Sequence, residues 1–155
     1  MGFGALSVKG RALRYLAQRE HSRVELERKL ARHVQDTDEA SAQTLIAQAL
    51  DQLTAAGLLS EARAAEAVLT SQGQRFGSRR LKQVLQFKGL DPGLISAVLQ
   101  RARGTELERA REVWRRRFGS PPGDALERAR QMRFMAGRGF DGDVIRRVVQ
   151  GLQDD

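Results

Sequence analysis

The distribution of proline and of apolar residues restricts this chain to helices. All three prolines lie at positions 92, 121 and 122, so glycine is the only helix breaker in the first 91 residues. Apolar residues recur at helical spacing, as in Ile46, Ala49, Leu50 and Leu53, and no run of alternating β-branched residues occurs. The sequence therefore predicts an all-α fold.

Glycines, prolines and capping residues divide the chain into nine expected helices. One of them should begin at Ser22, because Ser22 and Glu25 have the spacing of a capping box, in which each side chain satisfies an unpaired backbone N–H group. The expected helices span residues 7–19, 22–33, 40–56, 60–72, 78–88, 92–102, 105–117, 124–137 and 142–151.

One local pattern occurs twice, fifty residues apart, as KGLDPGLISAVL from Lys88 and RGFDGDVIRRVV from Arg138. In each copy a glycine, Gly89 or Gly139, can end one helix in the left-handed conformation, and an aspartate two positions later can cap the next helix. Ile95 and Ile145 are expected to be equivalent core positions. Weaker similarity elsewhere extends the pattern, so we expect three tandem three-helix-bundle repeats forming an elongated, curved molecule, with repeats at 1–58 (with an N-terminal extension), 59–103 and 104–155.

Basic residues exceed acidic ones by 27 to 19, and nearly all of them are arginine, which suits phosphate and carboxylate recognition. The densest run, from Arg75 to Lys88, holds five basic residues and no acid. The balance favours an acidic partner. The candidate partner-binding or DNA-binding residues are Arg23, Arg28, Lys29, Arg32, Arg75, Arg79, Arg80, Lys82, Lys88, Arg115, Arg116, Arg117, Arg138, Arg146 and Arg147.

The expected helix over 78–88 separates its basic residues from its core. Leu81, Val84 and Leu85 form the apolar stripe, and the helical period places Arg79, Arg80 and Lys82 largely outside it. Three cations near a helix N-terminus also oppose the helix dipole, which favours binding over folding as their role.

No catalytic constellation is visible in the sequence. There are two histidines, no HExxH motif, no phosphate-binding loop and no nucleophile beside a base, so we expect no enzymatic activity, no metal site and no cofactor. His21 should be a surface or staple residue. Most aromatic residues among Phe76, Phe87, Trp114, Phe118, Phe134 and Phe140 should be core, with Phe76 or Phe87 as the alternative that faces a groove. The lack of cysteine, of a long apolar segment and of a secretory signal favours a soluble cytoplasmic protein.

Four blocks in order resemble successive motifs of the RecX family: REHSRVELERKL (19–30), AAGLLSEARAAE (55–66), QRFGSRRLKQVLQFKGL (74–90) and RQMRFMAGRGFDGDVIRRVV (130–149). The resemblance implies three repeated three-helix units that bind the RecA recombinase and its nucleoprotein filament and mainly restrain ATP hydrolysis and strand exchange. The sequence departs from the family pattern at three positions. Ser60 stands where an acid is usual, Ala64 where an aromatic residue is usual, and Val84 where a glutamate is usual.

The resemblance leaves alternatives open. The partner is expected to be the RecA filament, with direct contacts to single- or double-stranded DNA possible, no membrane, and a monomeric chain. One alternative is a stand-alone helical DNA-binding protein that inserts the helix at 78–88 or 142–151 into a major groove. Another is a purely structural helical adaptor.

Overall fold

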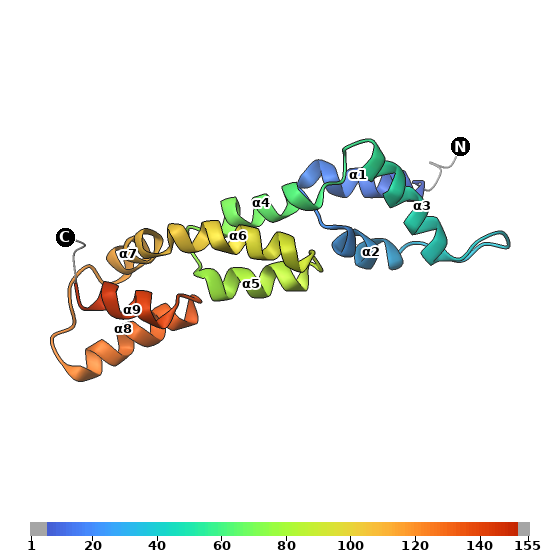
Figure 1. Cartoon of the computed structure of the whole chain (residues 1–155). Coiled ribbons are helices and arrows are strands. Elements are labelled where there is room, and N and C mark those ends of the chain that lie inside the picture. The colour runs from blue at the N-terminus through green and yellow to red at the C-terminus, as the bar shows by residue number, and fades with distance from the viewer. Residues whose placement is uncertain (1–5, 152–155) are drawn as a thin grey trace. The chain divides into compact units, whose positions relative to one another are not determined.

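The computed structural model describes residues 6–151, and within that range the chain forms nine α-helices and no strand (Figure 1). The all-α prediction is confirmed, and each helix agrees with its expected range to within two residues. The helices are α1 (Val8–Gln18), α2 (Arg23–Ala31), α3 (Ala42–Ala55), α4 (Glu61–Gln72), α5 (Ser78–Phe87), α6 (Pro92–Gly104), α7 (Glu106–Arg117), α8 (Ala125–Gly137) and α9 (Gly142–Val149).

Short polar side chains determine where most of the helices begin. The predicted capping box is present at α2, where the Ser22 hydroxyl accepts from the Glu25 N–H and the Glu25 carboxylate accepts from the Ser22 N–H. Such caps replace hydrogen bonds that the first turn of a helix otherwise lacks. Side chains that also accept a hydrogen bond from the first turn of the helix that follows them are Ser7, Ser41, Ser60, Asp91, Asp124 and Asp141.

The two glycine corners have the predicted conformation. Gly89 and Gly139 have φ values of 68° and 85°, in the left-handed region that favours glycine. Close packing adds a second requirement, because a Cβ on Gly89 would lie 2.4 Å from the Val24 side chain and one on Gly139 would lie 2.4 Å from Arg80 Cβ. Each corner thus packs tightly against the first turn of another helix.

The contacts divide the chain into two compact units. Within the described residues, the first comprises 6–67 together with 88–90, and the second comprises 68–87 and 91–151. Leu26, Leu30, Leu50 and Leu53 lie in the core of the first unit, which is formed mainly by α1, α2 and α3. The repeat boundaries after residues 58 and 103 and the curved shape stay predictions.

In the second unit, α5 packs against α6, and α7 and α8 pack against α9 (Figure 1). Its core includes Met135, Phe140, Ile145 and Val148. Ile95 is also buried, so the expected core positions Ile95 and Ile145 are both confirmed as core.

The expectation that most of the aromatic candidates are core was wrong. Of the six, only Phe140 is fully buried, whereas Phe87 is 72% exposed and the other four are half-buried. His21 is completely buried, which excludes the expected surface position but agrees with the alternative of a staple residue before Ser22. The helical period locates a stripe of side chains, but contacts from distant segments decide which of its edges are covered.

Candidate functional site

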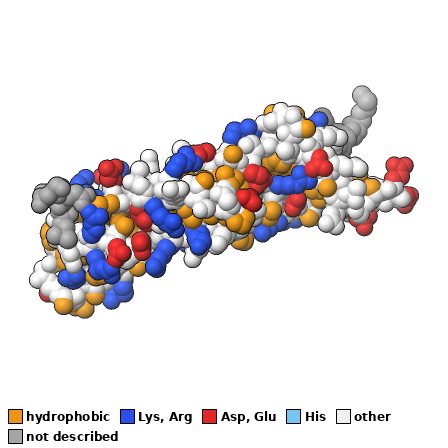
Figure 2. Space-filling model, viewed as in Figure 1, with side chains coloured by type: hydrophobic (Ala, Val, Ile, Leu, Met, Phe, Trp, Pro, Cys, Tyr) orange, Lys and Arg blue, Asp and Glu red, His pale blue; other side chains and the backbone are white. Residues whose placement is uncertain are grey.

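The fifteen candidate basic residues lie in two sets. Arg23, Arg28, Lys29 and Arg32 belong to the first compact unit, where Lys88 joins them through the glycine corner. The other ten belong to the second unit. On the face shown in Figure 2, Lys and Arg side chains recur over the part formed by α5, α8 and α9, whereas acidic side chains gather at the tip of the α2–α3 connection.

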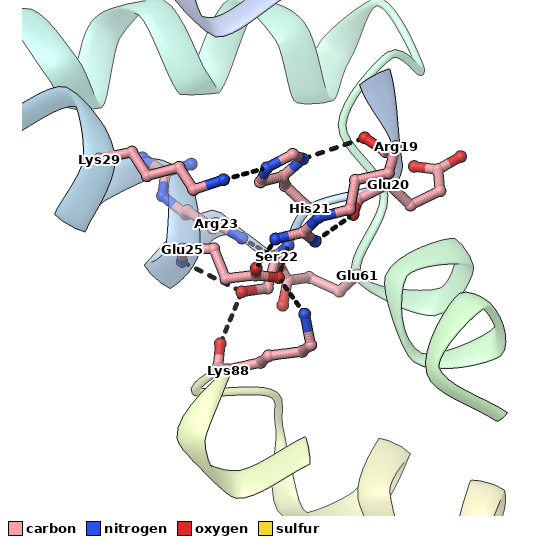
Figure 3. Close-up of polar contacts among 9 residues, drawn as sticks. All are labelled: Arg19, Glu20, His21, Ser22, Arg23, Glu25, Lys29, Glu61 and Lys88. Carbon is pink, nitrogen blue, oxygen red and sulfur yellow. Dashed lines mark hydrogen bonds and ion pairs between the residues drawn. The ribbon is translucent and has the colours of Figure 1, made fainter. Parts of the chain in front are cut away.

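Lys88 is part of an internal polar cluster at the start of α2 (Figure 3). Its ammonium lies 2.8 Å from Glu25 Oε1, its carbonyl accepts a 2.6 Å hydrogen bond from the Ser22 hydroxyl, and its side chain is 14% exposed. Arg19 lies 2.7 Å from the other Glu25 oxygen. Burial alone would raise the pKa of Glu25, but the hydrogen bonds from Arg19 and Lys88 outweigh it and hold that pKa at about 2.

His21 and Lys29 form a second part of the same cluster (Figure 3). The Lys29 ammonium donates to His21 Nε2 at 2.8 Å, so the remaining proton of the neutral ring lies on Nδ1 and is donated to the Arg19 carbonyl at 3.0 Å. Burial lowers the pKa of His21 and that of Lys29, and neighbouring cations add to both effects. Lys29 is therefore held inside the fold by a neutral imidazole.

Arg23 is also engaged within the fold. Its guanidinium pairs with Glu27 at 3.2 Å and with Asp51 at 2.9 Å, and its backbone N–H donates to the Glu61 carboxylate at 2.7 Å. Arg28 and Arg32 are exposed on α2. We call the contacts among Ser22, Arg23, Glu25, Glu61 and Lys88 the first polar joint.

The same arrangement recurs at the start of α5. Glu106, at the start of α7 and 3% exposed, accepts from the Ser78 N–H at 2.9 Å and from the Ser78 hydroxyl at 3.0 Å, and from the Asp141 N–H at 3.3 Å. The corner carbonyls of Arg138 and Gly139 accept from the N–H groups of Gly77 and Arg79. These contacts, the second polar joint, occupy the N–H groups of the first turn of α5.

Two residues of this joint differ from their equivalents in the first, and one of them reverses the charge. Glu25 is the third residue of α2 and pairs with Lys88, whereas the third residue of α5 is Arg80, and Arg138 stands at the corner in place of Lys88. Instead of an ion pair, this joint brings two guanidinium groups together. Both lie near the Phe76 ring, with Arg80 Cζ 5.1 Å and Arg138 Cζ 5.7 Å from the ring centroid.

A basic cleft lies beside this pair of arginines. It has a volume of about 280 Å³. It is formed by the α4–α5 connection and the ends of α7 and α8, and the residues that line it are Gln74, Arg75, Val113, Arg116, Arg117, Phe134 and Arg138. None of them is acidic. We call this feature the arginine cleft.

Aromatic rings hold the guanidinium groups of the arginine cleft in place. Arg117 and Arg138 each lie 5.2 Å from the Phe134 centroid, and Arg75 lies 5.4 Å from that of Phe76. Such cation–π contacts stabilise a guanidinium without neutralising its charge. Among the ion pairs of residues 6–151, none involves Arg75, Arg80, Arg117 or Arg138.

Arg109 fixes the connection that carries Arg75 and Phe76. Its guanidinium donates to the carbonyls of Gly73 at 2.5 Å, Phe76 at 2.6 Å and Ala102 at 2.7 Å. Burial lowers the pKa of Arg109, and Glu106 opposes that effect. The wall of the arginine cleft is thus held by a half-buried cation bound to backbone carbonyls.

The other candidate residues of the second unit are exposed and lie outside the arginine cleft or at its edge. Arg79 is 3.7 Å from Asp141, Arg115 and Arg116 pair with Glu112, and Arg146 pairs with Asp143. Lys82 and Arg147 are exposed. As predicted, Arg79, Arg80 and Lys82 lie outside the buried stripe of α5.

The role of the phenylalanines as supports for arginines was missed in the sequence. A signal for it exists, because Phe134 and Arg138 are four residues apart, a spacing that a helix brings to one face. The role of Glu106 has no such local signal, since its partners are 28 and 35 residues away.

Neither a metal centre nor a membrane span is found in the part of the chain that the structure describes. Within residues 6–151, no three His, Cys, Asp or Glu side chains gather as metal ligands would. None of the helices in that range is long and apolar enough to cross a bilayer.

These features define a helical protein built of linked three-helix groups. Its polar side chains form the two polar joints and line the arginine cleft. Comparison with known proteins specifies the family. Residues 9–42 match the family model described as RecX, first three-helix domain, and residues 105–149 match that of RecX, third three-helix domain. The chain belongs to the RecX family, which confirms the resemblance seen in its motifs.

Relatives support this assignment over nearly the whole chain. The regulatory protein RecX of Leptothrix cholodnii is 53% identical, with 94% of this chain and 88% of the relative covered. That of Ralstonia nicotianae is 45% identical, covering 97% and 92%. The crystal structure of RecX from Lactobacillus salivarius has a TM-score of 0.73 at 19% identity, over 94% of both chains, and shows the likeness of fold.

Proposed function

We propose that this chain regulates a RecA-type recombinase by binding the RecA–DNA filament, and that it mainly restrains ATP hydrolysis and strand exchange. The observation that carries the proposal is membership of a family whose relatives are named regulatory proteins. In this proposal the chain acts by binding alone, as a monomer in the cytoplasm, without a cofactor or a catalytic step of its own.

The charge distribution supports a filament as the partner. Exposed cations lie on α5, at the end of α7 and on α9. The arginine cleft adds the guanidinium groups of Arg75, Arg117 and Arg138, which have no ion pair within residues 6–151. A nucleoprotein filament offers phosphates in its grooves, and the affinity of cations for phosphates depends on salt.

The test is ATP hydrolysis by the recombinase on single-stranded DNA, measured as the concentration of this chain is raised. We expect hydrolysis to fall, and the effect to weaken as salt is increased. If hydrolysis is unchanged at concentrations that saturate the filament in a sedimentation assay, the proposal is wrong. Binding to duplex DNA without any effect on the recombinase would support the stand-alone DNA-binding alternative.

A charge-reversal variant tests the exposed face of α5. Replacing Arg79, Arg80 and Lys82 together by glutamate should weaken filament association and flatten its salt dependence, while the thermal melt changes little because all three side chains are exposed. A variant that restrains the recombinase at wild-type concentration would remove this face from the proposal. The Arg115, Arg116 and Arg117 set would then be tested next.

A further inference from the structure

The two polar joints differ at one pair of positions, and this difference leaves positive charge without compensation. Glu25 and Lys88 neutralise each other in the first joint at 2.8 Å. Arg80 and Arg138 occupy the equivalent positions in the second, and neither has an acidic partner among residues 6–151. Because the third residue of a helix is also an unfavourable place for a cation, an external anion would stabilise this site.

The guanidinium groups around the arginine cleft are arranged for an anion with several oxygen acceptors. Arg75 and Arg80 lie over the Phe76 ring, Arg117 lies over Phe134, and Arg138 is within 5.7 Å of both rings. A guanidinium held over a ring loses little further freedom on binding. It can still present N–H donors in the fork geometry that matches phosphate oxygens.

We propose that the arginine cleft binds single-stranded nucleic acid directly, holding the backbone phosphate of one nucleotide with Arg117 and Arg138 and stacking an adjacent base against the guanidinium planes that the phenyl rings support. Aromatic and guanidinium planes are the surfaces on which unstacked bases bind. A duplex keeps its bases stacked on one another, so it can offer this cleft phosphates alone. The proposal rests on the proposed function only in that a filament would supply the strand.

An acidic protein segment is the competing occupant. Carboxylates could neutralise the arginines, but an acidic segment has no large planar ring to stack on the guanidinium groups that Phe76 and Phe134 support. The aromatic support therefore favours the nucleic acid.

The experiment measures binding by the full chain without any recombinase. Fluorescence anisotropy compares a labelled oligothymidylate of about 20 nucleotides with an abasic strand and a duplex of the same length. We expect the oligothymidylate to bind at least about fivefold more tightly than either, with an affinity that falls as salt rises. Unlabelled polyglutamate should compete poorly.

Variants locate the binding in the cleft. Arg117→Gln combined with Arg138→Gln should weaken oligothymidylate binding by roughly tenfold or more. The matched control is Arg128→Gln with Arg133→Gln, which removes two exposed cations of α8 outside the cleft and should change the affinity by less than about twofold. Arg138→Lys keeps the charge without the guanidinium plane and should reduce the preference for oligothymidylate over the abasic strand.

Three results would overturn the proposal: equal affinity for the three nucleic acids, equal losses in the cleft variant and its control, or displacement by polyglutamate at matched charge. A thermal melt of each variant excludes a loss through unfolding. Because no recombinase is present, a failure here is distinct from a failure of the proposed function, which the ATP hydrolysis assay reports.

Discussion

Glu106 offers a direct test of the second polar joint. Its buried carboxylate accepts hydrogen bonds from the Ser78 N–H, the Ser78 hydroxyl and the Asp141 N–H, which link the start of α7 to the starts of α5 and α9. Replacing Glu106 by alanine removes the acceptor and leaves these donors in a site where the glutamate itself is 3% exposed. The carboxylate also provides negative charge beside the N-terminus of α5, where it is favourable.

The expected loss follows from the groups left without a partner. A buried donor that loses its acceptor costs about 1 to 3 kcal/mol, and the loss of a helix cap costs about 1 kcal/mol. Water entering the space left by the side chain would satisfy part of this demand. We therefore expect Glu106→Ala to lower the free energy of unfolding by roughly 3 to 5 kcal/mol, a large share of the stability of a small protein.

Urea denaturation followed by circular dichroism measures this loss. The matched control is Glu108→Ala, because Glu108 is an exposed acid in the same turn of α7, and its replacement should cost less than about 0.5 kcal/mol. Glu106→Gln should fall between the two, since an amide oxygen still accepts. If Glu106→Ala costs no more than the Glu108 control, the joint does not stabilise the fold as argued.

Three further predictions concern stability. The pKa of Glu25 is about 2 in the fold against 4.5 ordinarily. Its contribution to the free energy of unfolding, about 3 kcal/mol, is therefore complete above about pH 4.5 and is lost as pH falls toward 2. Glu25→Gln should remove most of this pH dependence in urea titrations. Truncating Ile95 or Ile145 to alanine should cost about 2 to 5 kcal/mol in thermal melts, and unchanged midpoints for both would refute their equivalence. Gly139→Ala should cost about 2 kcal/mol or more, because its φ is positive and a Cβ would meet Arg80, whereas Gly137→Ala, with open space, should be neutral or stabilising; equal effects would contradict the close approach.

Local features of the fold were predictable because neighbouring residues determine them. The capping box at Ser22 and the glycine corners depend on side chains within a few residues of each backbone group that they satisfy. The exposure of Arg79, Arg80 and Lys82 follows equally from the helical period.

The candidate site was less predictable because its contacts are distant in sequence. Lys88 is part of the basic run, and only the fold shows that Glu25, 63 residues away, holds it. The burial of Glu106 has no local sign either, since its partners Ser78 and Asp141 are 28 and 35 residues away. Composition could indicate that arginines gather, but not which of them are already neutralised.

The polar joint also limits how the chain can be extended. Each joint needs two components from one group of three helices: a glutamate at its start, Glu61 or Glu106, and a tight glycine corner. Together they bind the start of the second helix in the preceding group. The start of α2 has such a corner in addition to its own Ser22 cap, whereas α8 has the cap of its own Asp124, and α1 has no acid in its first turn to serve a corner. We therefore expect that copies of this chain do not join head to tail through a further joint of this kind.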